Sequence, residues 1–350
     1  MEGIEDIRQD ITKQAALYAS GEFNSYFKYC SDNPDVIKGI FKDKGIRFTQ
    51  PRALNDPLEF NPTMRFSGSR DYYQLYDLNG YLFPSIEGFF RVQIIDSQIN
   101  KFGILSLTKI PNLFDMWSQY ANGHRGFIIE FKGEFWRNQC MKSKTGIAYP
   151  VKKVEYVEEY TLNLDELVNE NKEIPVEIIH RELFLKKTSR WQHEHEYRMV
   201  RPLSDHSDYK LPQTKYTYRG ADDTNLYLFP FDWDCVASVV LGAYMSVENK
   251  EMIASVCETN NIEWSQAFIF RDKKDSFGKP CTVFIVTPGR TDAKEAILQA
   301  QPYNLCIDSW HFNKDRSPKS ITKLSNLPYY LAHKEIVNTY YDNLKANTSK

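Results

Sequence analysis

The sequence Trp191-Gln192-His193-Glu194-His195-Glu196-Tyr197-Arg198 packs more ionisable side chains together than any other stretch of this chain. If these residues form a β-strand, alternation places Glu194, Glu196 and Arg198 on one face. Two carboxylates this close raise the pKa of at least one of them, unless a cation or a ligand hydroxyl intervenes. Arg198 is a candidate for that cation. Such carboxylate pairs concentrate at functional sites.

A purely structural interpretation of the same stretch remains open. A solvated edge strand held by a Glu–Arg pair has the same pattern, and short motifs often match by chance. The neighbouring cations Lys186, Lys187 and Arg190 leave a similar choice. They either contact the phosphates of a nucleic acid locally or form a solvated helix end.

Composition indicates a globular protein with an ample core. The 350 residues suffice for one large or two modest domains, and 42% are hydrophobic. The chain is rich in aromatic residues, with 22 Phe, 22 Tyr and 6 Trp, which suits stacking pockets as well as cores. A formal net charge of −2 gives no general attraction to nucleic acids or anionic membranes, so any nucleic acid has to bind locally.

The cysteines and the N-terminus predict a cytoplasmic protein. The six cysteines lie far apart, without a C-x-x-C pair or the spacing of a zinc site, which is typical of reduced thiols. The first residues are acidic and lack the features of a signal peptide, and no run approaches 18 apolar residues. We therefore expect neither export nor a membrane span.

The spacing of apolar residues predicts an α+β fold. Strands separated by irregular lengths favour a split, strongly bent sheet with flanking helices over a regular doubly wound sheet. Five of these strands are expected at 26–29, 47–49, 103–108, 126–131 and 194–200. Further strands are expected at 145–160, 235–243, 265–271 and 281–287. Helices are expected at 4–19, 112–122, 175–188 and 246–259, with short helices in 70–100.

We divide the chain into three parts on this basis: an N-terminal helix (1–23), a core (24–275) and a mainly helical C-terminal extension (276–350). The extension lies beyond all the motifs described below. We expect it to be dispensable for chemistry and to serve partner contact or regulation.

Four motifs in a fixed order resemble a bacterial family of domains of unknown function over about residues 24–275. They are Tyr26–Ser31; Asn55-Asp56-Pro57-x-Glu59; Ser106-Leu107-Thr108 followed by Met116-Trp117-Ser118-x-Tyr120-Ala121-x-x-His124-x-Gly126; and Trp191–Arg198. Cys30 stands where that family usually has Arg, and Leu54 where it has Phe. The first departure weakens any role for the Tyr26–Ser31 motif.

The order of these motifs is also similar to that of ADP-ribosyltransferases, which have a polar or aromatic residue on a first strand, a Ser/Thr strand and a late Glu. This resemblance implies an ADP-ribosyltransferase-like core that uses NAD as a substrate. Breaking the nicotinamide–ribose bond builds oxocarbenium character on the ribose, which a carboxylate can stabilise. Glu196 is the candidate for that role, and Glu194 could orient or deprotonate the acceptor.

The same resemblance implies an NAD site. The residues assigned to it are Lys28, Tyr29, Ser106, Thr108, Trp117, Tyr120 and His124, with Ser106 and Thr108 holding the strand beside NAD and the aromatic rings stacking on nicotinamide. No metal site is predicted, because His193 and His195 supply only two ligands.

Structural alternatives exist for several of these residues. Met116, Trp117 and Tyr120 have helical spacing and suit a core. His124 follows a helix end, where a cation complements the helix dipole. Asn55-Asp56 has the composition of a tight turn.

Two function classes follow. The first is an ADP-ribosyltransferase that modifies a macromolecule (RNA, DNA or protein); the resemblance implies a bacterial toxin or phage-defence effector, with an antitoxin or regulatory protein as partner. The E-x-E pattern does not distinguish a protein acceptor from a nucleic-acid acceptor. The second is a non-catalytic nucleic-acid or nucleotide-binding module of a defence system, in which Glu194 and Glu196 form salt bridges.

Overall fold

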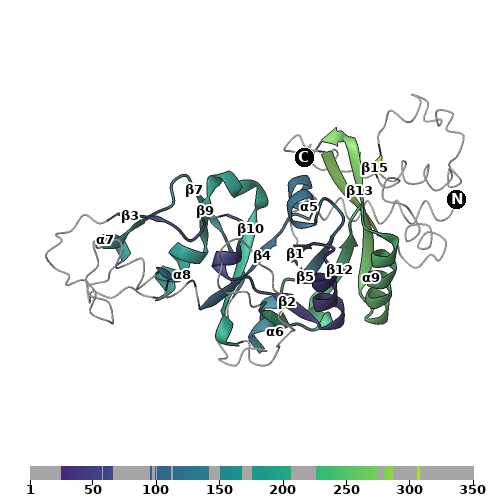
Figure 1. The fold of residues 1–350 in the computed structure, drawn as a ribbon, viewed down its shortest axis with the longest axis horizontal. Coiled ribbons are helices and arrows are strands. Elements are labelled where there is room, and N and C mark those ends of the chain that lie inside the picture. The colour runs from purple at the N-terminus through teal and green to yellow at the C-terminus, as the bar shows by residue number, and fades with distance from the viewer. Residues whose placement is uncertain are drawn as a thin grey trace, which may run out of the picture. The chain divides into compact units, whose positions relative to one another are not determined.

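The computed structural model describes residues 25–56, 58–65, 95–96, 99, 101–111, 113–141, 150–167, 176–205, 226–274, 280–286 and 306–307. The chain forms two compact units, each assembled from separate segments. The first unit combines Met1–Lys44, Lys109–Phe135 and Asp232–Lys350, and the second combines Gly45–Thr108 and Trp136–Phe231. Figure 1 labels many of their helices and strands.

The first unit contains a mostly antiparallel run of strands. In spatial order these are β14 (Pro280–Val286), β13 (Glu263–Lys274), β12 (Val236–Leu241), β5 (Phe127–Lys132) and β1 (Ser25–Cys30). Only β12 and β13 are parallel neighbours in this run. Helix α9 (Val247–Thr259) connects them, as a parallel pair requires. The short strand β15 (Cys306–Ile307) pairs with β13 in parallel and lies outside this run.

Two further helices belong to the first unit. Helix α2 (Pro34–Ile37) begins after Asn33, whose side chain accepts a hydrogen bond from the Asp35 amide. A π-helical turn (Lys38–Lys42) extends it. Helix α5 (Phe114–Tyr120) packs its Trp117 into a core with Ala121, which follows the helix, and with residues of β1, β5, β12 and β13: Phe27, Tyr29, Ile128, Val240 and Ala267.

The second unit is built on the antiparallel strands β4 (Phe102–Thr108), β10 (Glu196–Pro202) and β6 (Lys152–Lys153). Three small pairs surround them: β2 (Gly45–Arg47) with β11 (Leu228–Pro230), β3 (Thr63–Arg65) with β8 (Thr161–Asn163), and β7 (Glu155–Val157) with β9 (Lys186–Thr188). Its helices are α6 (Phe135–Met141), α7 (Leu164–Leu167) and α8 (Val176–Phe184).

The core of the second unit lies beside β4 and β10. It contains Phe60, Ile95, Ile99, Phe102, Ile104, Leu162, Leu167, Leu183, Phe184 and Val200, with Leu54, Met64 and Ile178 packed against it. The aromatic rings of Phe60 and Phe102 both contact Phe184 at the end of α8. This packing fixes the end of α8 next to the following strand, β9.

The structure confirms the α+β class and has strands that overlap those predicted at 26–29, 103–108, 126–131, 235–243, 265–271 and 281–287, whereas the ADP-ribosyltransferase-like arrangement stays a prediction. Three predicted bounds are wrong. The strand expected at 47–49 is β2, which ends at Arg47. The strand expected at 194–200 begins at Glu196, because Ser189–Glu194 form a 3-10 helix. The helix expected at 175–188 ends at Phe184, and Lys186–Thr188 form β9 instead.

Other predicted elements are shorter than expected or lie outside the described residues. The single strand expected at 145–160 is represented by β6 and β7. Within the C-terminal extension, β14 corresponds to the strand expected at 281–287, and the short strand β15 lies where helical sequence was expected. The helix expected at 4–19 and nearly all of 70–100 fall outside the described residues. Among the helices that the structure describes, none has the length and apolarity to cross a membrane.

Candidate functional site

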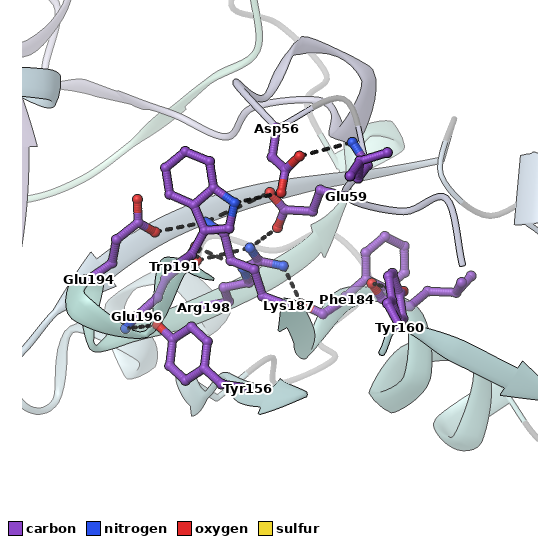
Figure 2. Close-up of polar contacts among 12 residues, drawn as sticks. Asp56, Glu59, Tyr156, Tyr160, Phe184, Lys187, Trp191, Glu194, Glu196 and Arg198 are labelled. Atoms are coloured by element: carbon purple, nitrogen blue, oxygen red, sulfur yellow. Dashed lines mark hydrogen bonds and ion pairs between the residues drawn. The ribbon is translucent and has the colours of Figure 1, made fainter. Parts of the chain in front are cut away.

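Five charged side chains of the second unit form a buried group, which we call the charge cluster (Figure 2). It comprises the carboxylates of Glu59, Glu194 and Glu196 and the cations of Lys187 and Arg198. Each residue is at least nine-tenths buried. Three negative and two positive charges leave a formal charge of −1. Burying so much charge is costly unless every group is paired.

Arg198 connects two of the carboxylates. Its Nε donates to Oε1 of Glu196 at 2.8 Å and its Nη2 donates to Oε2 of Glu196 at 2.9 Å, which is a bidentate pair. Its Nη2 also donates to Glu59, and its Nη1 donates to the Phe184 carbonyl at 2.8 Å. The guanidinium lies over the Phe60 ring. Three hydrogen-bond partners and one aromatic ring therefore fix the position of the Arg198 guanidinium.

Lys187 connects all three carboxylates. Its Nζ donates to Oε2 of Glu194 at 2.7 Å and to Oε2 of Glu196 at 3.0 Å, and it lies 3.8 Å from Oε2 of Glu59. The ammonium also lies 4.9 Å from the centre of the Trp191 ring. The two carboxylates of the E-x-E pair thus meet at Lys187, although they occupy different elements.

The Asn55–Glu59 motif joins the cluster through a side-chain turn. Oδ1 of Asp56 accepts from the Leu58 amide at 2.9 Å, and Oδ2 accepts from Nε1 of Trp191 at 2.7 Å. The first bond closes an Asx turn, which orients Glu59, and the second ties that turn to the Trp191–Arg198 motif. Two motifs far apart in sequence therefore build one site.

Strand β4 supports Glu196 from the other side. In the β4–β10 register, Thr108 lies opposite Glu196 and Ser106 lies opposite Arg198. The Ser106 side chain also helps to lower the Glu196 pKa. The Thr108 hydroxyl donates to the His195 carbonyl at 3.3 Å. The Glu196 amide donates to the Tyr156 hydroxyl at 2.8 Å, so the backbone at the start of β10 is also fixed.

The carboxylates of the cluster differ in their pKa values. Burial opposes ionisation of Glu196, but Arg198 and Lys187 outweigh it and hold the pKa of Glu196 at about 2. At Glu59 burial prevails over the same two cations, and its pKa is raised. Burial also opposes the charge of Lys187, yet the three carboxylates raise the Lys187 pKa. Glu59 therefore takes up a proton more readily than Glu196 does.

The aromatic residues predicted to bind NAD belong to the core of the first unit. Tyr29 and Trp117 pack edge to face, with ring centres 5.5 Å apart. The Tyr29 hydroxyl donates to the Ile110 carbonyl at 3.1 Å, and Nε1 of Trp117 donates to the Pro111 carbonyl at 3.0 Å. Trp117 is fully buried, so stacking on nicotinamide would require its ring to be uncovered. Lys28 and Tyr120 are half-buried.

His124 sits in a tight left-handed turn of the first unit. Asn122, Gly123 and His124 all have positive φ values, of 47°, 61° and 64°. The His124 ring stacks on Trp117 with centres 6.0 Å apart, and its Nε2 lies 3.3 Å from the Ser118 hydroxyl. Burial lowers the His124 pKa to about 4, so the ring is neutral at pH 7.

This burial predicts a pH-dependent stability. The folded-state pKa of His124, about 4, lies below its ordinary value of 6.5. The unfolded chain therefore binds a proton first, and the contribution of His124 to stability is lost as the pH falls from 6.5 to 4. The full loss is about 3 kcal/mol. The measurement is the free energy of unfolding against pH for the unaltered protein and for His124→Asn.

Asn suits this control because it tolerates the left-handed conformation better than most residues. Between pH 6.5 and 4, the free energy of unfolding should change less steeply with pH for His124→Asn than for the unaltered protein. The difference in slope should correspond to the uptake of about one proton on unfolding. Two parallel profiles would show that His124 does not titrate in this way.

Sequence reasoning missed Lys187 as a member of the site and left Glu59 without a role. It assigned Lys187 to phosphate contact or to a solvated helix end, whereas its side chain is buried. The signal is the strand at Lys186–Thr188, where alternation turns Lys187 inward and its neighbours outward. Among the described residues, no group of three or more His, Cys, Asp and Glu side chains is suited to hold a metal ion.

Comparison with known proteins gives one finding. Residues 116–199 match the model of a family described as a protein of unknown function, DUF2971. The matched segment runs from Met116 to Met199, so it includes Lys187, Glu194, Glu196 and Arg198 but not the Asn55–Glu59 motif. No curated protein and no solved structure matches the chain.

Proposed function

We propose that the chain is an NAD-dependent ADP-ribosyltransferase that modifies a macromolecule, with Glu196 as its catalytic carboxylate. The observation that carries the proposal is the register of β4 and β10. It places Thr108 opposite Glu196, and Ser106 opposite Arg198 two residues further along the same strands. The Ser/Thr strand and the late Glu of the transferase pattern are therefore direct neighbours.

The chemistry requires an ionised carboxylate near the ribose. The bond between ribose C1′ and the nicotinamide nitrogen breaks, nicotinamide leaves with the electron pair, and positive charge develops on the ribose. A pKa of about 2 keeps Glu196 ionised at neutral pH. The acceptor nucleophile then bonds to C1′ and releases its proton. Glu194, which shares Lys187 with Glu196, is the carboxylate assigned to that proton.

The described state is closed, since Glu196 is only 4% exposed and both of its oxygens face cations. Turnover therefore requires the cluster to open so that the ribose can reach Glu196. Arg198 can release Glu196 and keep Glu59 and the Phe184 carbonyl as partners. We therefore assign Glu59 the role of holding Arg198 in place while Glu196 is released.

The second candidate is the non-catalytic nucleic-acid or nucleotide-binding module. The closed cluster favours it, because Glu194 and Glu196 already form buried salt bridges in the described state. In this case the cluster fixes β9 and β10 and has no further chemistry. The binding surface would then lie elsewhere on the chain.

NAD turnover separates the two candidates. Purified full-length protein is incubated with NAD and bacterial cell extract, and released nicotinamide is measured together with ADP-ribose attached to macromolecules. We expect nicotinamide release above that of extract alone and of heat-denatured protein. Parallel extracts treated with ribonuclease, deoxyribonuclease or protease identify the acceptor class. Absence of both NAD binding and nicotinamide release would favour the binding module.

A further inference from the structure

A pocket of about 430 Å³ lies on the second unit, next to the elements that carry the charge cluster. Its lining comes from β6, the start of β7, helix α8 and the residue that follows it: Lys152, Lys153, Glu155, Ile178, Arg181 and Leu185. Strand β6 pairs with β10 at Arg198, and Leu185 lies two residues before Lys187. Neither Glu194 nor Glu196 lines this pocket.

The lining combines three cations, one carboxylate and two aliphatic side chains. Lys152, Lys153 and Arg181 are exposed, and among the described residues neither lysine has an ion-pair partner. Arg181 uses its Nε for Glu182 at 2.9 Å, and its side chain is 61% exposed. Lys152 and Lys153 therefore give the pocket positive charge that no ion pair of the described residues neutralises.

A structural role explains only part of this arrangement. Strand β6 ends the run of β4, β10 and β6, and lysines on an edge strand discourage pairing with another chain. That role accounts for Lys152 and Lys153. It does not account for Arg181, which comes from a helix, nor for a hollow bordered by Ile178 and Leu185.

We propose that this pocket binds a nucleoside phosphate, either as a free nucleotide or as one unit of a nucleic-acid strand. Lys152, Lys153 and Arg181 contact the phosphate, since Arg and Lys are the usual partners of phosphate oxygens. Ile178 and Leu185 offer an apolar surface to the base. Glu155 accepts hydrogen bonds from ribose hydroxyls. The volume lies within the usual range for small-ligand sites.

The test measures binding of AMP, inorganic phosphate and a single-stranded RNA decamer to the full-length protein without NAD. The altered protein carries Lys152→Gln, Lys153→Gln and Arg181→Gln. The matched control carries Lys101→Gln and Arg65→Gln, which alter exposed cations of the same unit; Arg65 pairs with Glu159 much as Arg181 pairs with Glu182.

We expect the triple variant to bind AMP or RNA about ten-fold more weakly or worse, and the control to bind as the unaltered protein does. For RNA, the slope of log K against log salt should fall by about 2, because three phosphate contacts contribute roughly 0.7 each. Tight AMP binding that RNA does not exceed identifies a free nucleotide as the ligand. Tight RNA binding with weak competition by AMP identifies a nucleic-acid strand.

Equal affinities of the triple variant and the control for both ligands would overturn the proposal, as would binding of inorganic phosphate as tight as that of AMP. The test does not depend on the proposed transferase activity. The triple variant leaves Glu194 and Glu196 in place, since neither lines the pocket, and binding is measured without NAD, so the comparison with the control holds whether or not the protein turns over NAD. A negative result for nucleotide binding at the pocket can therefore be distinguished from a negative result for transferase activity.

Discussion

Glu196→Gln should lower NAD turnover by about 10²-fold or more, the usual effect of removing one major electrostatic stabiliser of a transition state. Gln keeps the shape of the side chain and removes the negative charge that opposes the developing charge on the ribose. The measurement is the rate of nicotinamide release by the purified protein with NAD and extract. Near-normal turnover would lead us to abandon the transferase in favour of the binding module.

The variant should remain folded, which thermal unfolding checks. Replacing Glu196 changes the formal charge of the cluster from −1 to 0, and Arg198 keeps Glu59 and the Phe184 carbonyl as partners. The lost charge-assisted bonds cost about 1–3 kcal/mol. Glu194→Gln is the matched variant, because it also removes a partner of Lys187. It should reduce transfer to the acceptor more than NAD hydrolysis, which needs no acceptor base.

Arg198→Met should lower the free energy of unfolding by about 3–5 kcal/mol, the cost of leaving buried charge without its partner. Met approximates the length of the aliphatic stem, but the cluster becomes three carboxylates with one cation, a formal charge of −2. Glu59 and Glu196 both lose a guanidinium at once. Denaturant unfolding at pH 7 measures the effect.

Two companion variants separate this effect from a general loss of arginine. Arg65→Met breaks an exposed pair with Glu159, and exposed pairs contribute about 0–1 kcal/mol. Adding Glu59→Gln to Arg198→Met restores the formal charge to −1 and should recover part of the lost stability. A loss below about 1 kcal/mol for Arg198→Met would mean that the cluster opens to water and is not a buried network.

Apolar periodicity predicted most strands and helices because both units bury regular faces. It was wrong between α8 and β10, where the chain changes from helix to strand to 3-10 helix within a few residues. His195 adopts a left-handed conformation with φ of 47°. Such a conformation is uncommon for residues other than glycine, and it separates Glu194 from the strand that carries Glu196. Residue patterns do not indicate it.

The candidate site was predictable in part. The E-x-E-x-R pattern identified Glu196 and Arg198 correctly as neighbours on one face, because both lie within β10. Lys187 could not be found in this way, since a lone lysine is rarely buried and its partners come from three elements. The contact of Glu59 with the charge cluster could not be predicted either. Its partner Arg198 lies 139 residues away, and no local pattern reports a contact over that distance.

During synthesis, the ribosome releases Glu59 long before Arg198 and Lys187 exist to pair with it. Its carboxylate stays in water until β9 and β10 are made, and closing such a distant contact is slow. All segments of the second unit are available once Phe231 is made, whereas the first unit still lacks β12 and β13 at that point. The second unit can therefore fold co-translationally, and the first unit, which still needs β12 and β13, is completed last.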